Sequence, residues 1–361
     1  MRVCIVGAGY VGLALADLIS QSDHNVILYD TDTTKDSCHH LVVHHTMPRG
    51  CDIYLITVPT PVDENNKPDY TYVKQAAEAI AYAMDPIDIT HVILESTVGV
   101  GTTRNIVAPI LAKTGMPHGV GFSPERVSPG DTSISDAVKI ISALDDDTLG
   151  FLEMFYGQFF ELHKVATPEI AEMAKLVENA QRDVNIAFMN ECNELAELQD
   201  VPFQQVLAAC RTKWNFADYK PGLVGGHCIA VDPYFLMEGN PIEDMELTML
   251  EGAREVNSCE PNLVAMRIYH AAPKDCGTII VLGFGYKPNS KDSRNSGVFP
   301  VVEALDNLVR TCSPKHEIVH LYNRDAYDLF IKEHGIKKRF VAVVIEDDQF
   351  ADIEAFRLYK D

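Results

Sequence analysis

The segment R-V-C-I-V-G-A-G-Y-V-G, residues 2–12, decides the fold of the amino-terminal part of the chain. Its first five residues form an apolar strand, and after the glycines a helical pattern continues to about Ile19. A second apolar strand, Val26–Tyr29, ends on Asp30. A strand, a glycine turn, a helix and a second strand ending on an acid together predict a parallel sheet whose first turn binds a dinucleotide.

The glycines and the acid of this segment have different tasks in dinucleotide binding. Glycine permits a tight turn and lets the helix N-terminus come close to a pyrophosphate, whose negative charge the helix dipole favours. Asp30 is placed to accept hydrogen bonds from a ribose 2′-OH and repels a 2′-phosphate, which favours NAD over NADP. The predicted cofactor contacts here are Gly7, Gly9, Tyr10, Val11, Gly12 and Asp30.

Strands and helices continue to alternate along the chain. Apolar strands at 53–58, 91–94 and 119–122 alternate with helical patterns at 70–84 and 103–113. This alternation is typical of a mostly parallel sheet with helices on both faces, whose ligands bind beyond the carboxyl ends of the strands. The loops expected at that edge are Val58-Pro59-Thr60-Pro61, Glu95-Ser96-Thr97-Val98 and Ser123-Pro124-Glu125-Arg126.

Two residues of this edge have an ordinary structural interpretation as well. Thr97 is equally a strand-end hydroxyl that satisfies the backbone, and Glu125 is equally a surface partner of Arg126. The residues alone leave both alternatives open.

Between Asp30 and the strand at residue 53 the chain is polar and irregular. Four histidines, His39, His40, His44 and His45, bracket an apolar stretch at 41–43. Histidine clusters can bind metal ions, but alternation around so short an apolar stretch favours a small strand with solvated flanks. We therefore predict a strand here and no metal site.

The sequence T-K-W-N-F-A-D-Y-K-P-G-L-V-G-G-H-C-I-A-V-D-P-Y-F-L, residues 212–236, is typical of an active-site loop. Gly225 and Gly226 let the backbone turn tightly and approach a ligand, and they present the thiol of Cys228. An arbitrary free cysteine is more often a small buried hydrophobe. The glycines before it and the Asp232-Pro233 pair after it are poor core material, so we interpret Cys228 as the reactive centre.

A long helix precedes this loop. Thr167-Pro168-Glu169 is a helix start, and neither glycine nor proline recurs before residue 202. Lys175, Asn179 and Arg182 lie on one face of the predicted helix, which is either a solvated polar stripe or part of a site.

The remainder of the chain predicts a second α/β unit. A helical stretch at 246–270 completes a helical middle, where we expect two subunits to meet. A strand at 278–282 then runs into the glycine turn at 283–288, which favours a phosphate site. A helix at 298–309, strands at 317–322 and 340–345 and a helix at 325–333 follow. The predicted fold is α/β, with two Rossmann-like, doubly wound parallel-sheet domains, residues 1–165 and 273–361, joined by a central helical domain, residues 166–272.

Composition excludes several classes of function. The 361 residues include 52 acidic and 30 basic residues, a formal charge of −22, which argues against binding nucleic acid or an anionic membrane surface. No apolar run reaches the length of a membrane span and the first residues are a strand, not a signal peptide, so we expect a cytoplasmic protein. The nine cysteines contain no C-x-x-C pair, which favours reduced thiols over disulfides or a zinc site.

Taken together, the motifs resemble those of the UDP-glucose/GDP-mannose dehydrogenase family, over nearly the whole chain. They occur in the family's order as G-x-G-Y-V-G-L, V-P-T-P-V, E-S-T-V, S-P-E-R, A-K-L-V-E-N, G-G-H-C and Y-K-P-x5-R. The residues Q-R-D-V-N-I-A, T-K-W-N-F and P-G-L-V-G-G-H-C-I look like those of the UDP-N-acetylhexosamine (GlcNAc/GalNAc) 6-dehydrogenases of bacterial surface polysaccharide synthesis. His227 stands where UDP-glucose and GDP-mannose enzymes usually carry Ser.

The resemblance implies a reaction. The family oxidises the C6 hydroxymethyl group of a nucleotide sugar to a carboxylate with two NAD, through an aldehyde and a cysteine thioester. Cys228 would be the nucleophile, and Lys175 and Asn179 would stabilise the oxyanion. Thr97, Glu125 and Asp232 would position water and move protons during thioester hydrolysis.

The resemblance also implies binding residues. NAD would be held by the glycine turn and Asp30, with Thr60, Thr97 and Arg294 nearby. The UDP-sugar would contact Glu125, Arg126, Lys175, Asn179, Tyr219, Gly222, Gly225, Lys287 and Arg254. Arg254 would also lie near the contact of a homodimer. The segment between Asp30 and Asp52 is shorter than the family usually has, and Gly99-Val100 replaces the common Tyr-Pro, which puts the affinity for NAD in question.

Other functions remain as alternatives. UDP-glucose or UDP-N-acetylmannosamine is an alternative substrate. A two-electron β-hydroxyacid dehydrogenase would share the first fold but would need neither Cys228 nor a second α/β domain. The shortened segment after Asp30 favours one further possibility, a nucleotide-binding protein without turnover.

Overall fold

A computed structural model describes residues 1–35, 37–38, 41–126, 137–226, 228–240, 242, 245–272, 278–283, 296–312, 317–321, 332, 340–344 and 356–357. The chain divides into two compact units. The first unit comprises residues 1–178 and 234–245, and the second comprises 179–233 and 246–361. The division into three domains that the sequence suggests stays a prediction.

A large, mostly parallel sheet forms the centre of the first unit, with strand order β3-β4-β2-β1-β5-β6-β7-β8-β9. Within it β3 and β4 pair antiparallel, as do β7 and β8, while the other neighbours are parallel. The strands are β1 (Arg2–Val6), β2 (Asn25–Tyr29), β3 (Ser37–Cys38), β4 (Leu41–His44), β5 (Ile53–Ile56), β6 (Thr90–Leu94), β7 (His118–Phe122), β8 (Lys139–Ala143) and β9 (Leu162–Lys164).

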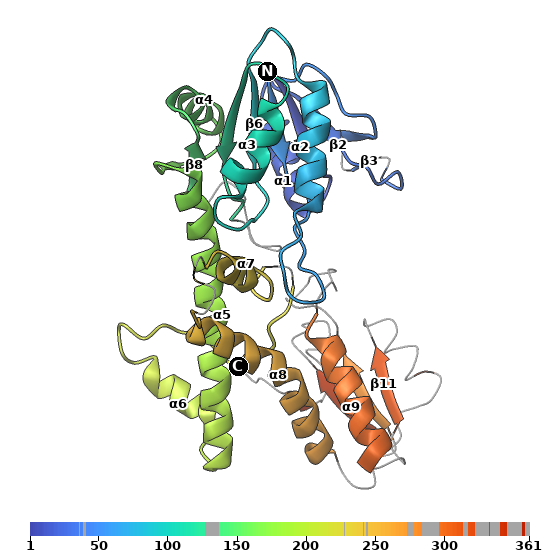
Figure 1. The fold of residues 1–361 in the computed structure, drawn as a ribbon. Coiled ribbons are helices and arrows are strands. Elements are labelled where there is room, and N and C mark those ends of the chain that lie inside the picture. The colour runs from blue at the N-terminus through green and yellow to red at the C-terminus, as the bar shows by residue number, and fades with distance from the viewer. Residues whose placement is uncertain are drawn as a thin grey trace. The chain divides into compact units, whose positions relative to one another are not determined.

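Helices cover both faces of this sheet. Because side chains alternate along a strand, Cys4 and Val6 point to one face and Val3 and Ile5 to the other. The first face packs against α2 (Thr71–Ala83) and α3 (Ala108–Ala112), and the second against α1 (Tyr10–Ile19) and α4 (Asp146–Tyr156). Figure 1 shows α1, α2 and α3 beside these strands. The doubly wound arrangement predicted from the sequence is confirmed.

The helix predicted at 103–113 differs in its first turn. Thr103–Val107 is a π-helical turn, η1, and only Ala108–Ala112 is α-helical. The buried carboxylate of Glu172 accepts hydrogen bonds from the backbone N–H groups of Gly101, at 2.5 Å, and Thr103, at 2.9 Å. A side chain far along the sequence therefore satisfies the start of this helix, which local residue preferences do not predict.

One long helix, α5 (Pro168–Leu198), contains the border between the two units. The second unit continues with α6 (Phe203–Cys210), α8 (Thr248–Ala271) and α9 (Val298–Cys312). The short helix α7 (Asp232–Glu238) also contains a border.

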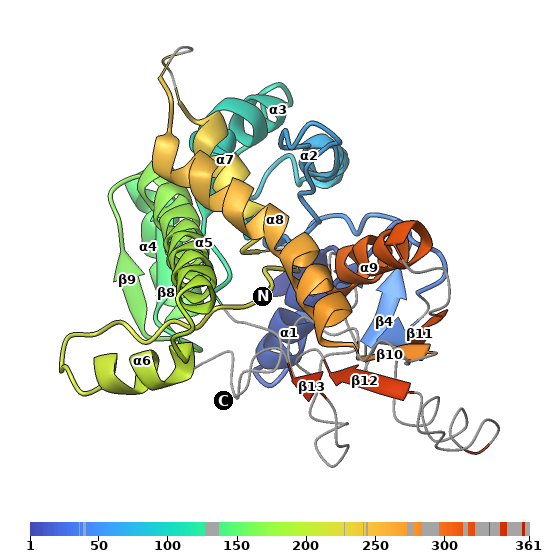
Figure 2. The same cartoon turned by 90° about the horizontal axis from the view of Figure 1, so that it is seen from below.

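The second sheet is small and parallel, with strand order β11-β10-β12-β13. Its strands are β10 (Thr278–Leu282), β11 (Glu317–Leu321), β12 (Phe340–Val344) and β13 (Phe356–Arg357). Ile279 and Val281 pack with Val264 of α8 and Val301 of α9 in one core, and Figure 2 shows α8 and α9 side by side. Apart from residue 332, the predicted helix at 325–333 lies outside the described residues. Two parallel α/β sheets and a long helix confirm the predicted fold class.

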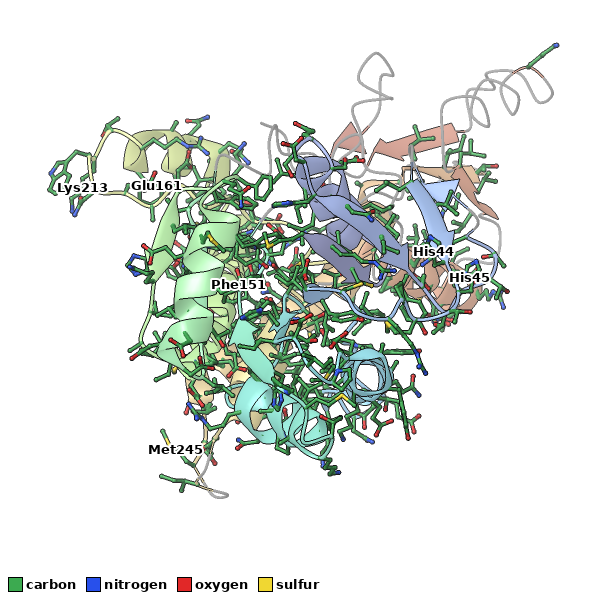
Figure 3. All side chains as sticks on the ribbon, turned by 90° about the horizontal axis from the view of Figure 1, so that it is seen from above. His44, His45, Phe151, Glu161, Lys213 and Met245 are labelled. Carbon is green, nitrogen blue, oxygen red and sulfur yellow. The ribbon has the colours of Figure 1, made fainter. Side chains whose placement is uncertain are left out.

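The histidine-rich segment contains the predicted strand. β4 ends on His44, and His45 follows it; Figure 3 labels both side chains at this edge of the sheet. Within the described ranges no group of three or more His, Cys, Asp or Glu residues is arranged to hold a metal ion, while His39 and His40 lie outside those ranges. Among the helices described, none is long and apolar enough to cross a membrane.

Candidate active site

The glycine turn after β1 has the geometry that dinucleotide binding requires. Gly7 has a positive φ of 111°. A methyl group at Gly12 would overlap the carbonyl oxygen of Gly7 and lie 2.7 Å from the hydroxyl of Thr57. At Gly9, by contrast, a methyl group would meet nothing within 4 Å, and Tyr10 is exposed at the start of α1. Two glycines thus form the turn and the third leaves open space for a pyrophosphate, so these residues fit the cofactor.

These two glycine positions give a matched test. Gly12→Ala is expected to lower the free energy of unfolding by about 1–3 kcal/mol, because the new methyl group overpacks the turn. Gly9→Ala is expected to keep the wild-type melting temperature and to weaken NAD binding at least about tenfold, because the methyl group occupies the space a pyrophosphate needs. Thermal unfolding and NAD titration separate the two effects. Equal stability losses in both variants would contradict this assignment.

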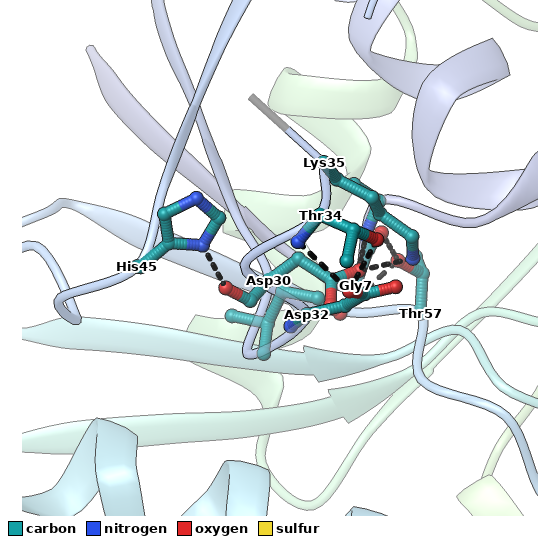
Figure 4. Close-up of polar contacts among 9 residues, drawn as sticks. Gly7, Asp30, Asp32, Thr34, Lys35, His45 and Thr57 are labelled. Atoms are coloured by element: carbon teal, nitrogen blue, oxygen red, sulfur yellow. Dashed lines mark hydrogen bonds and ion pairs between the residues drawn. The ribbon is translucent and has the colours of Figure 1, made fainter. Parts of the chain in front are cut away.

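Asp30 is held in place at the end of β2 by several donors, shown in Figure 4. Its carboxylate accepts hydrogen bonds from the backbone N–H of Ala8 and the ammonium of Lys35, both at 2.8 Å, and from the N–H of Asp32 at 2.9 Å. Burial opposes its ionisation, but these hydrogen bonds outweigh burial and lower the pKa of Asp30. The contact of Lys35 with Asp30 was not predicted from the sequence. The only sequence feature that could have indicated it is the position of Lys35 five residues after Asp30.

The next two loops at the carboxyl edge of the sheet are joined to one another. The hydroxyl of Thr60 donates to the carbonyl oxygen of Thr97 at 2.7 Å. The hydroxyl of Ser96 donates to the carbonyl oxygen of Val58 at 2.6 Å. The structure therefore brings Thr60 and Thr97 together, as both proposed roles require.

Glu125 lies in a buried charged cluster that the sequence did not predict. The ammonium of Lys139 is 2.8 Å from the carboxylate of Glu95 and 3.5 Å from that of Glu125. The hydroxyl of Tyr156 donates to the second carboxylate oxygen of Glu95. Burial opposes the charge of Lys139, but the two carboxylates outweigh it and raise its pKa, while burial raises the pKa of Glu95.

Arg126 does not use its guanidinium to form a surface pair with Glu125, which was one of the two alternatives for this loop. Its guanidinium binds Glu178 through two hydrogen bonds, at 2.6 and 3.2 Å, and donates to the carbonyl oxygen of Val138 at 2.9 Å. Only its backbone N–H donates to Glu125, at 2.7 Å. The carboxylate of Glu125 pairs with the ammonium of Lys139, which the sequence did not single out.

Lys175, in the part of α5 that belongs to the first unit, is buried, with 8% of its surface exposed. Within the part of the chain that the structure describes, no carboxylate forms an ion pair with its ammonium group. A lysine buried without a counter-ion is costly, and such costs concentrate at functional sites. Asn179 is also buried, whereas Arg182 is exposed, so the predicted polar face is not a uniformly solvated stripe.

In the second unit three predicted catalytic residues are connected. The side-chain amide of Asn179 donates to the carboxylate of Asp232 at 2.5 Å. The backbone N–H of Asp232 donates to the carbonyl oxygen of Cys228 at 2.8 Å. Cys228 is exposed, and Gly226, two residues before it, has a positive φ of 78°. The thiol is accessible, and glycine at 226 is required by the backbone.

A buried polar network holds the loop that contains Cys228. The side-chain amide of Asn190 forms hydrogen bonds with both the N–H and the carbonyl oxygen of Gly222. The guanidinium of Arg254 donates to the carboxylate of Asp183 and to the carbonyl oxygen of Ala230. The sequence predicted Gly222 and Arg254 as site residues but not the two α5 residues, which a helical pattern alone does not distinguish from core.

The other predicted substrate residues are less constrained. Tyr219 is half-buried, and its N–H donates to the carbonyl oxygen of Ala217 at 2.9 Å. Gly225 is half-buried in the turn before Cys228. Trp214 is 93% exposed, in the same loop as Lys213, which Figure 3 labels. Lys287 and Arg294 lie outside the described residues.

Comparison with known proteins decides the family. Residues 1–40 and 37–159 match the NAD binding domain of the UDP-glucose/GDP-mannose dehydrogenase family, and residues 169–259 match its central domain. The chain belongs to this family. It is an NAD-dependent dehydrogenase, and both the predicted family and the predicted cofactor are confirmed.

Curated relatives and a solved structure agree with this membership. The dehydrogenase is 33% identical over 338 residues to Protein CapL of Staphylococcus aureus, covering 84% of this chain and 79% of that protein. It is 32% identical over 339 residues to UDP-N-acetyl-D-glucosamine 6-dehydrogenase of Pseudomonas aeruginosa, covering 84% and 80%. The structure of a UDP-D-ManNAc dehydrogenase from Pyrococcus horikoshii matches with a TM-score of 0.84 at 26% identity, covering 98% and 91%.

The match to the NAD binding domain has one interruption. It consists of two pieces that meet at residues 37–40. This position lies in the segment between Asp30 and Asp52. The two pieces therefore join at β3, at the edge of the first sheet.

Proposed function

We propose that this dehydrogenase oxidises the C6 hydroxymethyl group of a UDP-N-acetylhexosamine to a carboxylate, using two NAD and Cys228 as the nucleophile. The observation that carries the proposal is the exposed thiol of Cys228, followed by Asp232 and Asn179 in one hydrogen-bonded group. An accessible cysteine beside an acid and an amide suits covalent capture of an aldehyde.

The N-acetyl group of the proposed substrate rests on two indications. His227 replaces the serine common in enzymes for UDP-glucose and GDP-mannose. Two of the similar proteins described above are named for N-acetylglucosamine and N-acetylmannosamine. These sugars differ in the orientation of single groups, which a few hydrogen bonds distinguish. UDP-N-acetylmannosamine and UDP-glucose are therefore the alternative substrates.

The proposed chemistry has two oxidations and one hydrolysis. Bound NAD would supply the hydride acceptor for both oxidations. In the first, C6 loses a hydride and its hydroxyl loses a proton, which gives an aldehyde. The sulfur of Cys228 then forms a bond to C6, and the thiol proton goes to the carbonyl oxygen. Loss of a second hydride and of the hydroxyl proton from this thiohemiacetal gives a thioester. Water then adds to C6, the bond between C6 and sulfur breaks, one proton of the water returns to sulfur, and the other goes to solvent as the carboxylate leaves. Covalent capture keeps a reactive aldehyde from escaping.

Lys175 and Asn179 are proposed to stabilise the negative charge that develops on the oxygen at C6. Lys175 has no ion-pair partner among the described residues, so its cation is available for such an oxygen. Asn179 has its amide oriented by Asp232. Glu125, Thr97 and Asp232 are proposed to position the hydrolytic water and accept its proton. The contact of Glu125 with Lys139 supports an ordered carboxylate there.

The binding residues remain proposals as well. NAD would lie on the glycine turn with its ribose at Asp30, near Thr60 and Arg294. Arg126, Tyr219, Gly222, Gly225 and Lys287 would hold the UDP-sugar. A homodimer is supported by apolar side chains exposed along α5, namely Phe188, Leu195 and Leu198, which a second copy would cover.

The deciding experiment measures NADH formed per sugar consumed, with NAD in excess. UDP-N-acetylglucosamine, UDP-N-acetylgalactosamine, UDP-N-acetylmannosamine and UDP-glucose are tested in parallel. We expect two NADH per sugar with one N-acetyl substrate. A ratio of one would indicate a two-electron dehydrogenase, and binding of NAD and sugar without NADH would indicate a nucleotide-binding protein without turnover. Either result contradicts the proposal.

A further inference from the structure

Asn190 of α5 binds both backbone groups of a single loop residue. Its amide nitrogen donates to the carbonyl oxygen of Gly222 at 3.1 Å, and its amide oxygen accepts from the N–H of Gly222 at 2.8 Å. Only 2% of its surface is exposed. An amide placed in this way replaces a neighbouring strand, because it satisfies a donor and an acceptor of the same residue.

The network continues from Asn190 to the other side of Cys228. The amide nitrogen of Asn190 also donates to the side-chain oxygen of Asn257 at 2.9 Å, and Asn257 donates to the carboxylate of Asp183 at 2.8 Å. Asp183 binds Arg254, whose guanidinium donates to the carbonyl oxygen of Ala230 at 3.1 Å. Buried side chains of α5 and α8 thus connect Gly222 to Ala230, which lie on opposite sides of Cys228 in the sequence.

The loop needs such an external support. It contains Gly222, Gly225 and Gly226, and glycine leaves the backbone free to take many conformations. Attack on an aldehyde carbon requires the sulfur within about 3–3.5 Å and correctly aligned, and a misplacement of about 1 Å costs on the order of 100-fold in rate. Asn190 can hold the loop in place through its hydrogen bonds alone, without taking part in the reaction.

We propose that Asn190 is a positioning residue that fixes the Cys228 loop, so that the sulfur captures the aldehyde before it leaves. The inference rests on the proposed role of Cys228 as nucleophile. We call the two hydrogen bonds between Asn190 and Gly222 the clamp. When the clamp is broken, the first hydride still leaves C6 and the hydroxyl proton goes to solvent. The aldehyde then departs uncaptured, and the second oxidation is lost.

The test compares Asn190→Ala and Asn190→Asp with a control on the same helix. Asn193→Ala removes an amide that donates to the carboxylate of Glu197 at 3.3 Å and that has no hydrogen bond to the described residues of the loop. Each variant is incubated with NAD and the UDP-sugar in the presence of hydroxylamine, which traps free aldehyde as an oxime. NADH per sugar, oxime, uronic acid, the KM for NAD and the melting temperature are measured.

We expect Asn190→Ala to form uronic acid about 100-fold more slowly, with oxime accumulating and NADH per sugar falling towards one. Asn190→Asp should be intermediate, because its carboxylate still accepts from Gly222 but cannot donate to it. Asn193→Ala should match the wild type, and the KM for NAD should be unchanged throughout. A merely structural role would lower the melting temperature and all rates without releasing aldehyde.

Two results have different meanings. If either Asn190 variant folds and still gives two NADH per sugar without oxime, the clamp is refuted and the proposed function stands. If Cys228→Ser in the same assay forms uronic acid at the wild-type rate, the proposed function itself is refuted.

Discussion

Cys228→Ser is expected to lower uronic acid formation at least about 1,000-fold, because a hydroxyl at this position is a far weaker nucleophile than a thiolate. NAD should bind as in the wild type, since the glycine turn and Asp30 belong to the first unit and Cys228 to the second. The reaction is followed by separating UDP-sugar from UDP-uronic acid after single and multiple turnovers. Loss of the second NADH should accompany loss of the acid.

Cys259→Ser is the matched control for this variant. Cys259 is also an exposed cysteine of the second unit, but it lies on α8 and not in the glycine loop. It should keep full activity and the ratio of two NADH per sugar. Full activity of Cys228→Ser, or a similar loss in both variants, would remove Cys228 from the mechanism.

Lys139→Met is expected to lower the free energy of unfolding by about 3–5 kcal/mol, because it removes one partner of a buried ionic cluster. Lys139 and Glu95 have side chains only 3% and 0% exposed. The variant therefore leaves the carboxylate of Glu95 buried without its cation, and Glu125 without the charge beside it. Urea unfolding at pH 8 measures the loss.

The stability loss should depend on pH in a defined direction. Burial raises the pKa of Glu95 above that of an unfolded glutamate. A carboxyl group with a raised pKa in the folded state favours folding more as the pH falls, so part of the loss should be recovered below pH 8 as Glu95 takes up a proton. If the loss of unfolding free energy in Lys139→Met did not change with pH, Glu95 would not be a buried carboxylate without a counter-charge.

The control removes an exposed pair of the same chemistry. Lys164 lies 3.0 Å from Glu153, with side chains 50% and 52% exposed. Lys164→Met should cost less than about 1 kcal/mol, because water and salt screen the pair. If both lysine variants unfold at the same urea concentration, the cluster around Lys139 is not the stabilising feature described.

Features set by neighbouring residues could be predicted from the sequence. The glycine turn of residues 7–12 and the long helix α5 follow from short-range rules on glycine conformation, helix caps and apolar periodicity. The exposure of Cys228 could be predicted in the same way, because the glycines and the Asp-Pro pair of its loop are unsuited to a core. These predictions agree with the turn, the helix and the exposed thiol.

Features that depend on residues far apart in the sequence could not be predicted. The π-helical turn before α3 is satisfied by Glu172, and Glu125 meets Lys139 rather than its neighbour Arg126. Asn190 and Asp183 occupy inward positions of α5 that a helical pattern assigns to core packing. Their partners are known only once α8 and the loop have been placed beside them.

The border between the two units has a consequence for synthesis on the ribosome. The first unit needs residues 234–245, including Glu238, which accepts a hydrogen bond from the hydroxyl of Tyr70 at 2.7 Å. The nascent chain therefore lacks part of the first unit until residues 179–233 have been translated. A chain that ended at residue 178 would not contain the whole unit.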